Sequence, residues 1–314
     1  MQILILLSFI FLSQCTEPVR RDEVPVVEAP AKPPVDLSRE DLADLKKTVW
    51  VFKFANETTV THPALQGIPV GEILKEEIQK VLGGENSPFT VQSGDEEKTL
   101  LTASQMGDQA IDPLALSRNL AGSEVSGFVL GRASLFEMGV DGEQSEGIFK
   151  MRTVSLKLEA TYELYDSSTG KAVVRGRDAQ QLSESRADFL GAAPALNDVE
   201  TKTRTLAARI AKSVVGRLAP FSTKLAWGGR VLRIEGGRVY INSGRKTGLA
   251  MGDILKIVER PRQILDPQTG QIMGEAPGRM KGTLKIIQFF GGDSAIGILQ
   301  SGGSILPGDR VELY

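Results

Sequence analysis

One stretch near the middle of the chain constrains the fold most, because its hydrophobicity alternates from residue to residue. From Thr153 to Leu164, polar and apolar side chains take turns without interruption. Successive side chains of a β-strand point to opposite faces, so the pattern predicts a strand with one buried face and one wet face. Turn residues follow at 166–170, and 171–180 returns as a second, antiparallel strand.

Segments with helical spacing of apolar residues lie on both sides of this pair of strands in the sequence. Pro69 suits a first helical turn, and Gly83-Gly84 ends the apolar repeat that follows it. The expected elements are a short helix over 38–46 with Ser38 as N-cap, strands over 48–54 and 89–92, and helices over 69–82, 112–120 and 197–218. This succession predicts a layered α/β domain, a mixed sheet with helices, over residues 38–222.

Residues 228–314 contain short strand patterns and no long helical repeat. Gly236-Gly237 supplies the two positive φ angles of a tight hairpin turn. Two Gly-Asp pairs, Gly252-Asp253 and Gly308-Asp309, each precede a strand, where Gly can turn the backbone and Asp can bond nearby amides. The expected strands cover 231–234, 238–242, 253–258, 283–290, 294–299 and 310–313. The repeated corners predict a small, barrel-like all-β domain, so the fold class of the chain is α+β.

Cys15 is the only cysteine of the 314-residue chain, and it closely follows an apolar run over residues 3–12. Ten residues are too few to cross a bilayer, which takes about 20, but they suit a secretory signal. The segment resembles a bacterial lipoprotein signal, which implies cleavage before Cys15 and lipid attachment to it. An ordinary cleaved signal with an incidental cysteine is the alternative. We therefore expect a signal peptide over 1–14 and a lipidated, proline-rich, extended tether over 15–37.

The composition gives little support for catalysis or for nucleic-acid binding. The 37 Lys and Arg residues nearly balance the 39 Asp and Glu residues, and neither sign forms a long block. His62 is the only histidine, which excludes a histidine-based triad or a multi-histidine metal site, and its place before Pro63 favours a structural role. The carboxylates of 95–97 are expected to be a solvated run beside Lys98. The sequence therefore predicts no enzyme activity, no cofactor and no metal.

The all-β part of the chain resembles a known family. Its ordered motifs are 239–244, 248–253, 266–274 and 308–309. Over about residues 228–312 this succession resembles the C-terminal domain of the flagellar assembly protein T family. The preceding part, especially 49–54 and 154–180, is similar to the α/β domain shared by that family, the curli secretion lipoprotein and lipoprotein activators of penicillin-binding proteins. The first resemblance implies a periplasmic ring component around the flagellar basal body.

Three functions stay open on the sequence alone. The leading expectation is a lipoprotein at the periplasmic face of the outer membrane, anchored through Cys15, that acts as a structural or assembly component of the flagellar basal body. Its partners would be the membrane and other protein subunits, either ring components or further copies of itself, and not nucleic acid. The alternatives are a lipoprotein regulator of a peptidoglycan synthase, which the tether suits equally well, and a curli-type secretion channel. Lys157, Glu159 and Glu163 on the wet face count against the channel, because lipid disfavours charge.

Overall fold

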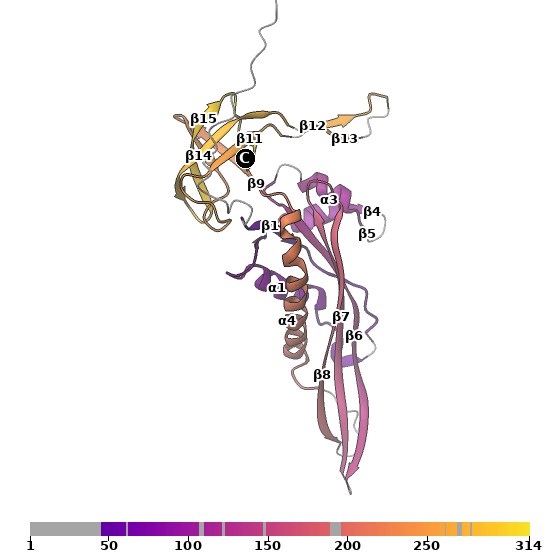
Figure 1. Cartoon of the computed structure of the whole chain (residues 1–314). Helices are drawn as coiled ribbons and strands as arrows, with labels where there is room; N and C mark the ends of the chain where they lie inside the picture. Colours follow the sequence, from indigo (N-terminus) through magenta and orange to yellow (C-terminus); the bar gives the residue numbers. More distant parts are fainter. Residues whose placement is uncertain are drawn as a thin grey trace, which may run out of the picture. The chain divides into compact units, whose positions relative to one another are not determined.

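The computed structural model of the chain describes residues 45–60, 62–106, 110–120, 123–146, 149–188, 196–260, 262–268, 272–276 and 278–314. These residues form a mixed sheet with helices and a closed β-barrel (Figure 1), so the predicted α+β fold class is confirmed. The predicted signal peptide, Cys15, the tether and residues 38–44 of the first expected helix lie outside the described residues. The predicted end of that helix is wrong, because residues 45–46 are not helical and lead directly into a strand that begins at Lys47. The domain boundaries at 38–222 and 228–314 stay predictions.

The mixed sheet has six strands. They are β1 (Lys47–Val51), β2 (Ala55–Asn56), β3 (Phe89–Gln92), β6 (Gly127–Glu146), β7 (Phe149–Asp166) and β8 (Ala172–Asp188). Their order is β3-β1-β6-β7-β8, with β2 paired to β6. β1 is parallel to both of its neighbours, whereas β6, β7 and β8 form an antiparallel meander. The predicted pair of strands is therefore confirmed, although its second strand continues to Asp188 instead of ending at residue 180.

Helices cover one face of this sheet. The helices α1 (Val70–Leu82) and α4 (Val199–Leu218) pack there, with the 3-10 turns η2 (Pro63–Leu65) and η3 (Ala219–Lys224). Even-numbered side chains of β7 meet the apolar stripe of α4 in this core, which is the burial that both periodicities predict. The residues concerned are Val154, Leu156, Leu158, Ala160, Tyr162, Leu164, Val199, Leu206, Ile210, Val214 and Leu218. β7 and β8 run alongside α4 and continue past its first turn (Figure 1). No helix in the described ranges is both long enough and apolar enough to cross a bilayer.

The opposite face of the sheet is covered in part. Four short elements pack there, namely α2 (Glu97–Ala103), β4 (Gln105–Met106), β5 (Ala110–Ile111) and α3 (Pro113–Leu120). α2 and α3 share a second, smaller core with Trp50, Phe52, Phe128 and Tyr165. The expected helix over 112–120 is confirmed, and Asp112 accepts a hydrogen bond from an amide of its first turn at 2.9 Å. The sequence pattern does not predict α2, because none of its side chains is fully buried.

The all-β part closes into a six-stranded barrel, as predicted. Its strands are β9 (Gly228–Glu235), β10 (Arg238–Ile241), β11 (Ile254–Val258), β14 (Met280–Phe290), β15 (Ser294–Gly302) and β16 (Arg310–Leu313). They follow one another around the barrel in the order β10-β15-β14-β11-β16-β9. The interior is apolar and includes Trp227, Val231, Val239, Ile241, Leu255, Ile257, Leu284, Ile286, Ala295 and Val311. A separate two-stranded ribbon, β12 (Arg262–Leu265) and β13 (Ile272–Ala276), is not anticipated by the sequence pattern.

The two Gly-Asp corners have the predicted chemistry. Gly252 and Gly308 adopt φ angles of 96° and 91°, in the left-handed region that a Cβ disfavours. Asp253 Oδ2 accepts from the Ala250 amide at 2.7 Å, and Asp309 Oδ2 accepts from the Leu306 amide at 2.7 Å. Each aspartate thus bonds the amide three residues before it. The corners let short strands change direction, and this permits closure of the barrel.

Candidate functional site

A groove with a volume of about 960 Å³ lies on the face of the six-stranded sheet that α2 and α3 cover in part, which we call the second face. β2, β6, β7 and β8 line it together with residues of the α2–α3 segment. The apolar lining includes Leu101, Ile111, Pro113 and Leu130, and the polar lining includes Glu57, Arg132, Thr161, Glu163 and Arg175. Ligand sites commonly measure about 300 to 1,000 Å³ and combine apolar walls with a few placed polar groups. The groove is therefore the candidate binding site.

Arg132 of β6 forms the first polar contact set of the groove. Its Nε donates to Thr161 Oγ1 at 3.2 Å, and its Nη1 lies 3.3 Å from Glu57 Oε1. The side chains of Arg132 and Glu57 are 54% and 52% exposed, so solvent screens their attraction. The alternation of each strand places these residues on one face, because β2 pairs with β6 and β6 with β7.

Tyr165, Glu163 and Arg175 form the second contact set. Arg175 Nε of β8 lies 3.1 Å from Glu163 Oε1, and the Tyr165 hydroxyl donates to Glu163 Oε2. Burial, followed by this hydrogen bond, raises the pKa of Tyr165 to about 12. The phenol is therefore protonated at neutral pH and acts as a hydrogen-bond donor, not as a base.

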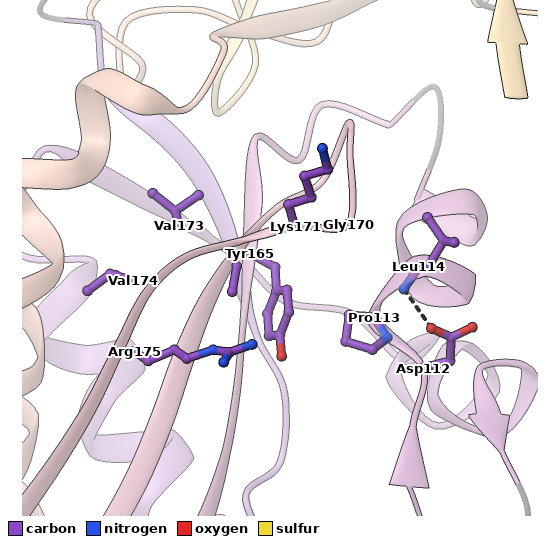
Figure 2. Close-up of a pocket in the computed structure, with 10 residues that line it drawn as sticks. Asp112, Pro113, Leu114, Tyr165, Gly170, Lys171, Val173, Val174 and Arg175 are labelled. Carbon is purple, nitrogen blue, oxygen red and sulfur yellow. Dashed lines mark hydrogen bonds between the residues drawn. The ribbon is translucent and has the colours of Figure 1, made fainter.

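A second hollow, of about 640 Å³, adjoins the groove at Tyr165 and Arg175. Figure 2 shows the Arg175 side chain extending toward Tyr165, with Pro113 and Leu114 of α3 on the other side of the ring. The turn between β7 and β8 closes this hollow with Gly170. Tyr165 and Arg175 thus line both hollows, which makes them the centre of the candidate site.

The charged network continues along the same face beyond the groove. Arg177 Nη2 donates to Glu159 Oε2 at 2.6 Å, and the Ser134 hydroxyl donates to the other oxygen of Glu159. These two bonds, Arg177 first, hold the pKa of Glu159 below its ordinary value. Farther along, Lys157 Nζ lies 3.7 Å from Asp141 Oδ1. The face that the sequence predicts to be wet is therefore covered in part: Ser155 and Glu159 are buried on it, and Glu159 binds Arg177.

This arrangement suits non-covalent recognition. The apolar wall can hold hydrocarbon, and the arginines can donate to carboxylates or carbonyl oxygens. His62 lies elsewhere, where its Nδ1 accepts from the Ala64 amide at 3.2 Å and caps η2, in line with the predicted structural role. Across the described ranges, no group of three or more His, Cys, Asp or Glu side chains is placed to hold a metal ion.

Two sequence predictions about individual residues have different outcomes. Cys15, the predicted lipid attachment site, lies outside the described residues. The expectation that 95–97 is a solvated run is wrong for Glu97, whose side chain is 16% exposed. Glu97 accepts from the Lys53 amide at 2.7 Å and from Lys75 Nζ at 2.6 Å. Contacts of Glu97 with two segments distant in the sequence, at Lys53 and at Lys75 of α1, keep this side chain from solvent, and a local charge run cannot reveal them.

The sequence pattern does not single out the residues that line the groove. Glu163 falls on the predicted wet face, and Arg175 falls in the predicted return strand. Their pairing depends on the register of β7 against β8, in which Glu163 lies opposite Arg175. A hairpin register derived from the 166–170 turn is the only signal that could have found them.

No protein-family model and no curated protein matches the chain. Solved structures that resemble it include the hypothetical protein CT253 from Chlamydia trachomatis, with 12% identity, TM-score 0.36, and coverage of 56% of this chain and 98% of that chain. Lipoprotein GNA1162 from Neisseria meningitidis has 13% identity, TM-score 0.29, and coverage of 55% and 99%. The LpoB C-terminal domain from Salmonella enterica has 16% identity, TM-score 0.25, and coverage of 43% and 83%. One of these is a lipoprotein by name, and none of the three is flagellar by name.

Proposed function

We propose that this chain is a lipid-anchored protein of the bacterial envelope that works by binding other proteins and not by catalysis. The observation that carries the proposal is the groove on the second face of the sheet. Its arginines already bind carboxylates of the same face, and Tyr165 is held protonated. Such a surface offers shape, apolar contact and hydrogen bonds, and its two glutamates, Glu57 and Glu163, each lie beside an arginine.

The proposed membrane anchor is a lipid attached to Cys15. Cleavage of the signal before this residue would leave a lipidated N-terminus at the periplasmic face of the outer membrane. More than one acyl chain holds a protein firmly, since each buried methylene contributes about 0.8 kcal/mol. Cys15→Ser is expected to move the protein from the membrane fraction to the soluble fraction. Unchanged membrane association, together with no acyl mass on the wild-type N-terminus, would refute the anchor.

The specific assembly that we propose is the flagellar basal body, on the resemblance of residues 228–312 to the flagellar assembly protein T family. Deletion of the gene is expected to abolish swimming and to remove a ring from isolated basal bodies, with normal cell-wall synthesis. Complementation with the wild-type gene is the control. Intact swimming with altered cell shape or antibiotic tolerance would instead favour a regulator of a peptidoglycan synthase.

The groove itself is tested by Arg175→Glu, which places a carboxylate beside Glu163. If the groove binds a partner, this variant should fold normally and still fail to restore the phenotype of the deletion. Arg209→Glu, at an exposed position of α4 on the other face of the sheet, is the matched control and should restore it. Full restoration by both variants would show that the groove is not the binding site.

A further inference from the structure

The six-stranded sheet has two edges of very different length. β3 ends the sheet on one side with 4 residues, and β8 ends it on the other side with 17 residues. Among the described strands, β8 is hydrogen bonded to β7 alone. A terminal strand presents outward N–H and C=O groups on alternate residues, and a short strand presents few of them. The short length of β3 therefore protects it from pairing with another chain, and β8 lacks this protection.

β8 also lacks other features that commonly prevent a long edge strand from pairing with another chain. From Val174 to Asp188 its register with β7 runs without a shift, so no bulge twists the edge away. The strand contains neither proline nor lysine. At about 3.3 Å per residue it presents an edge about 55 Å long. Its charged side chains are the remaining protection, and their positions determine which strand β8 can accept.

The charges on the wet face of β8 gather in its first half. Arg175 and Arg177 have side chains that are 71% and 69% exposed. The next four positions on this face are also exposed and are uncharged, namely Ala179, Gln181, Ser183 and Ser185. On this face the strand therefore has a cationic half followed by a neutral half.

This asymmetry favours one partner, a second copy of β8 in antiparallel orientation. Parallel pairing in register would place each arginine opposite its own copy, and like charges directly opposite each other destabilise a sheet. Antiparallel pairing centred on Gln180 places Arg175 opposite Ser185 and Arg177 opposite Ser183. Centring on the next residue, Gln181, would set Asp178 opposite Glu184 on the other face, so the register at Gln180 is the better one.

We infer that this chain forms a symmetric dimer in which two β8 strands pair antiparallel about Gln180 and join the two sheets into one. The pairing is isologous, so it consumes both long edges and leaves the two short β3 edges outside. It therefore closes at two copies instead of growing into a filament. The dimer does not depend on the proposed function, and it supplies a partner for the proposed assembly role.

Crosslinking tests the position of the two-fold axis. The full-length chain carries Cys15→Ser, so that an introduced thiol is the only one. Gln181→Cys lies one residue from the axis, where it and its copy would be diagonal neighbours about 7 to 8 Å apart, with their Cβ atoms somewhat closer. A short bis-maleimide should link it into a dimer at least tenfold more completely than Lys157→Cys, the residue opposite Gln181 on β7 and one strand farther from the axis. Equal linkage, or linkage only to another protein in cells, would overturn the dimer.

A second test adds charge at the proposed interface and needs no crosslinking. Ser183→Arg with Ser185→Arg would face Arg177 and Arg175 of the other copy, and it is expected to raise the dimer Kd about tenfold or more. Thr153→Arg adds a charge beside Ser185 but on β7, and it should leave the Kd unchanged. Analytical ultracentrifugation gives both values, and far-UV circular dichroism checks the fold. A monomeric wild type, or a Kd that the double variant does not change, would overturn the inference.

Discussion

The barrel has no edge strand, whereas the six-stranded sheet has two. Every strand of the barrel has two hydrogen-bonded neighbours, whereas the sheet ends at β3 and β8. A closed barrel can recognise a partner only through surface side chains, while an open sheet can also offer its backbone. The comparison also predicts which substitutions lower the stability of each part. In the barrel they are at the residues that allow closure, and in the sheet they are at side-chain pairs that cross between strands.

The largest effect is expected at Gly302, where β15 lies against β14. Gly302 has a φ of 92°, and a Cβ on it would lie 1.9 Å from the Lys281 carbonyl oxygen. Gly302→Ala should therefore separate β15 from β14 and lower the free energy of unfolding by about 3 kcal/mol or more. A Cβ on Gly303 would meet no atom within 4 Å, so Gly303→Ala is the control. Urea unfolding measures the free energy of unfolding of both variants. Equal decreases would contradict the prediction that the close contact of Gly302 with β14 is needed to close the barrel.

The next effect concerns a barrel corner. Asp309 accepts from the Leu306 amide at 2.7 Å and from Lys281 Nζ at 2.9 Å, and the side chains of Asp309 and Lys281 are 5% and 15% exposed. Asp309→Ala removes the carboxylate beside a mostly buried ammonium, so we expect a loss of about 2 to 3 kcal/mol. Glu312→Ala breaks a more exposed pair with Lys256 and should cost under about 1 kcal/mol. Thermal unfolding should separate the two variants, and similar melting temperatures would refute the corner's role.

A smaller effect is expected for a buried hydrogen bond between β7 and β8, whose acceptor also binds α4. The buried Tyr162 hydroxyl donates to Asp178 Oδ2 at 2.9 Å, and Ser213 Oγ of α4 donates to Asp178 Oδ1 at 2.7 Å. Tyr162→Phe keeps the ring and removes one bond, which should cost about 1 to 1.5 kcal/mol in chemical unfolding. Tyr240→Phe, where the ring packs edge-on against Phe290 of the barrel, should change stability by under about 0.5 kcal/mol. A larger loss of stability for Tyr240→Phe than for Tyr162→Phe would contradict this prediction.

The smallest effect is a dependence of stability on pH in the acid range, and it comes from Glu159 on the second face of the sheet. Because Arg177 and Ser134 lower the pKa of Glu159 in the folded state, the unfolded chain binds this proton more readily. The stabilisation is complete above the ordinary pKa of 4.5 and is lost as pH falls through the lower folded value. The melting temperature of Glu159→Gln should therefore fall less steeply below about pH 4.5 than that of the wild type.

The control for this pH dependence is Glu235→Gln, which alters an exposed pair with Arg233 on the barrel. Its melting temperature should follow the wild-type profile across the same pH range. Parallel profiles for the wild type and Glu159→Gln would show that the cross-strand pair contributes nothing to acid stability.

Elements with a strong period or a cap could be predicted from local sequence. The alternation of 153–164 gave β7, and the apolar stripe of 199–218 gave α4, since each pattern matches one burial geometry. The Gly-Asp corners were predictable because a positive φ and a short carboxylate act within a few residues. α2 has no such pattern: its side chains are not fully buried, and Glu97 is placed by contacts with Lys53 and Lys75, far from it in the sequence.

The sequence by itself determined that this chain has an α/β part, an all-β part and a single cysteine at position 15. Only the tertiary structure decided that Glu163 meets Arg175, that Arg132 meets Glu57, and that α2 and α3 leave a groove beside them. It also decided that β8 stands at an edge. The reason is physical: periodicity and caps depend on neighbours in the chain, whereas register, strand order and cavities depend on which distant segments pack together.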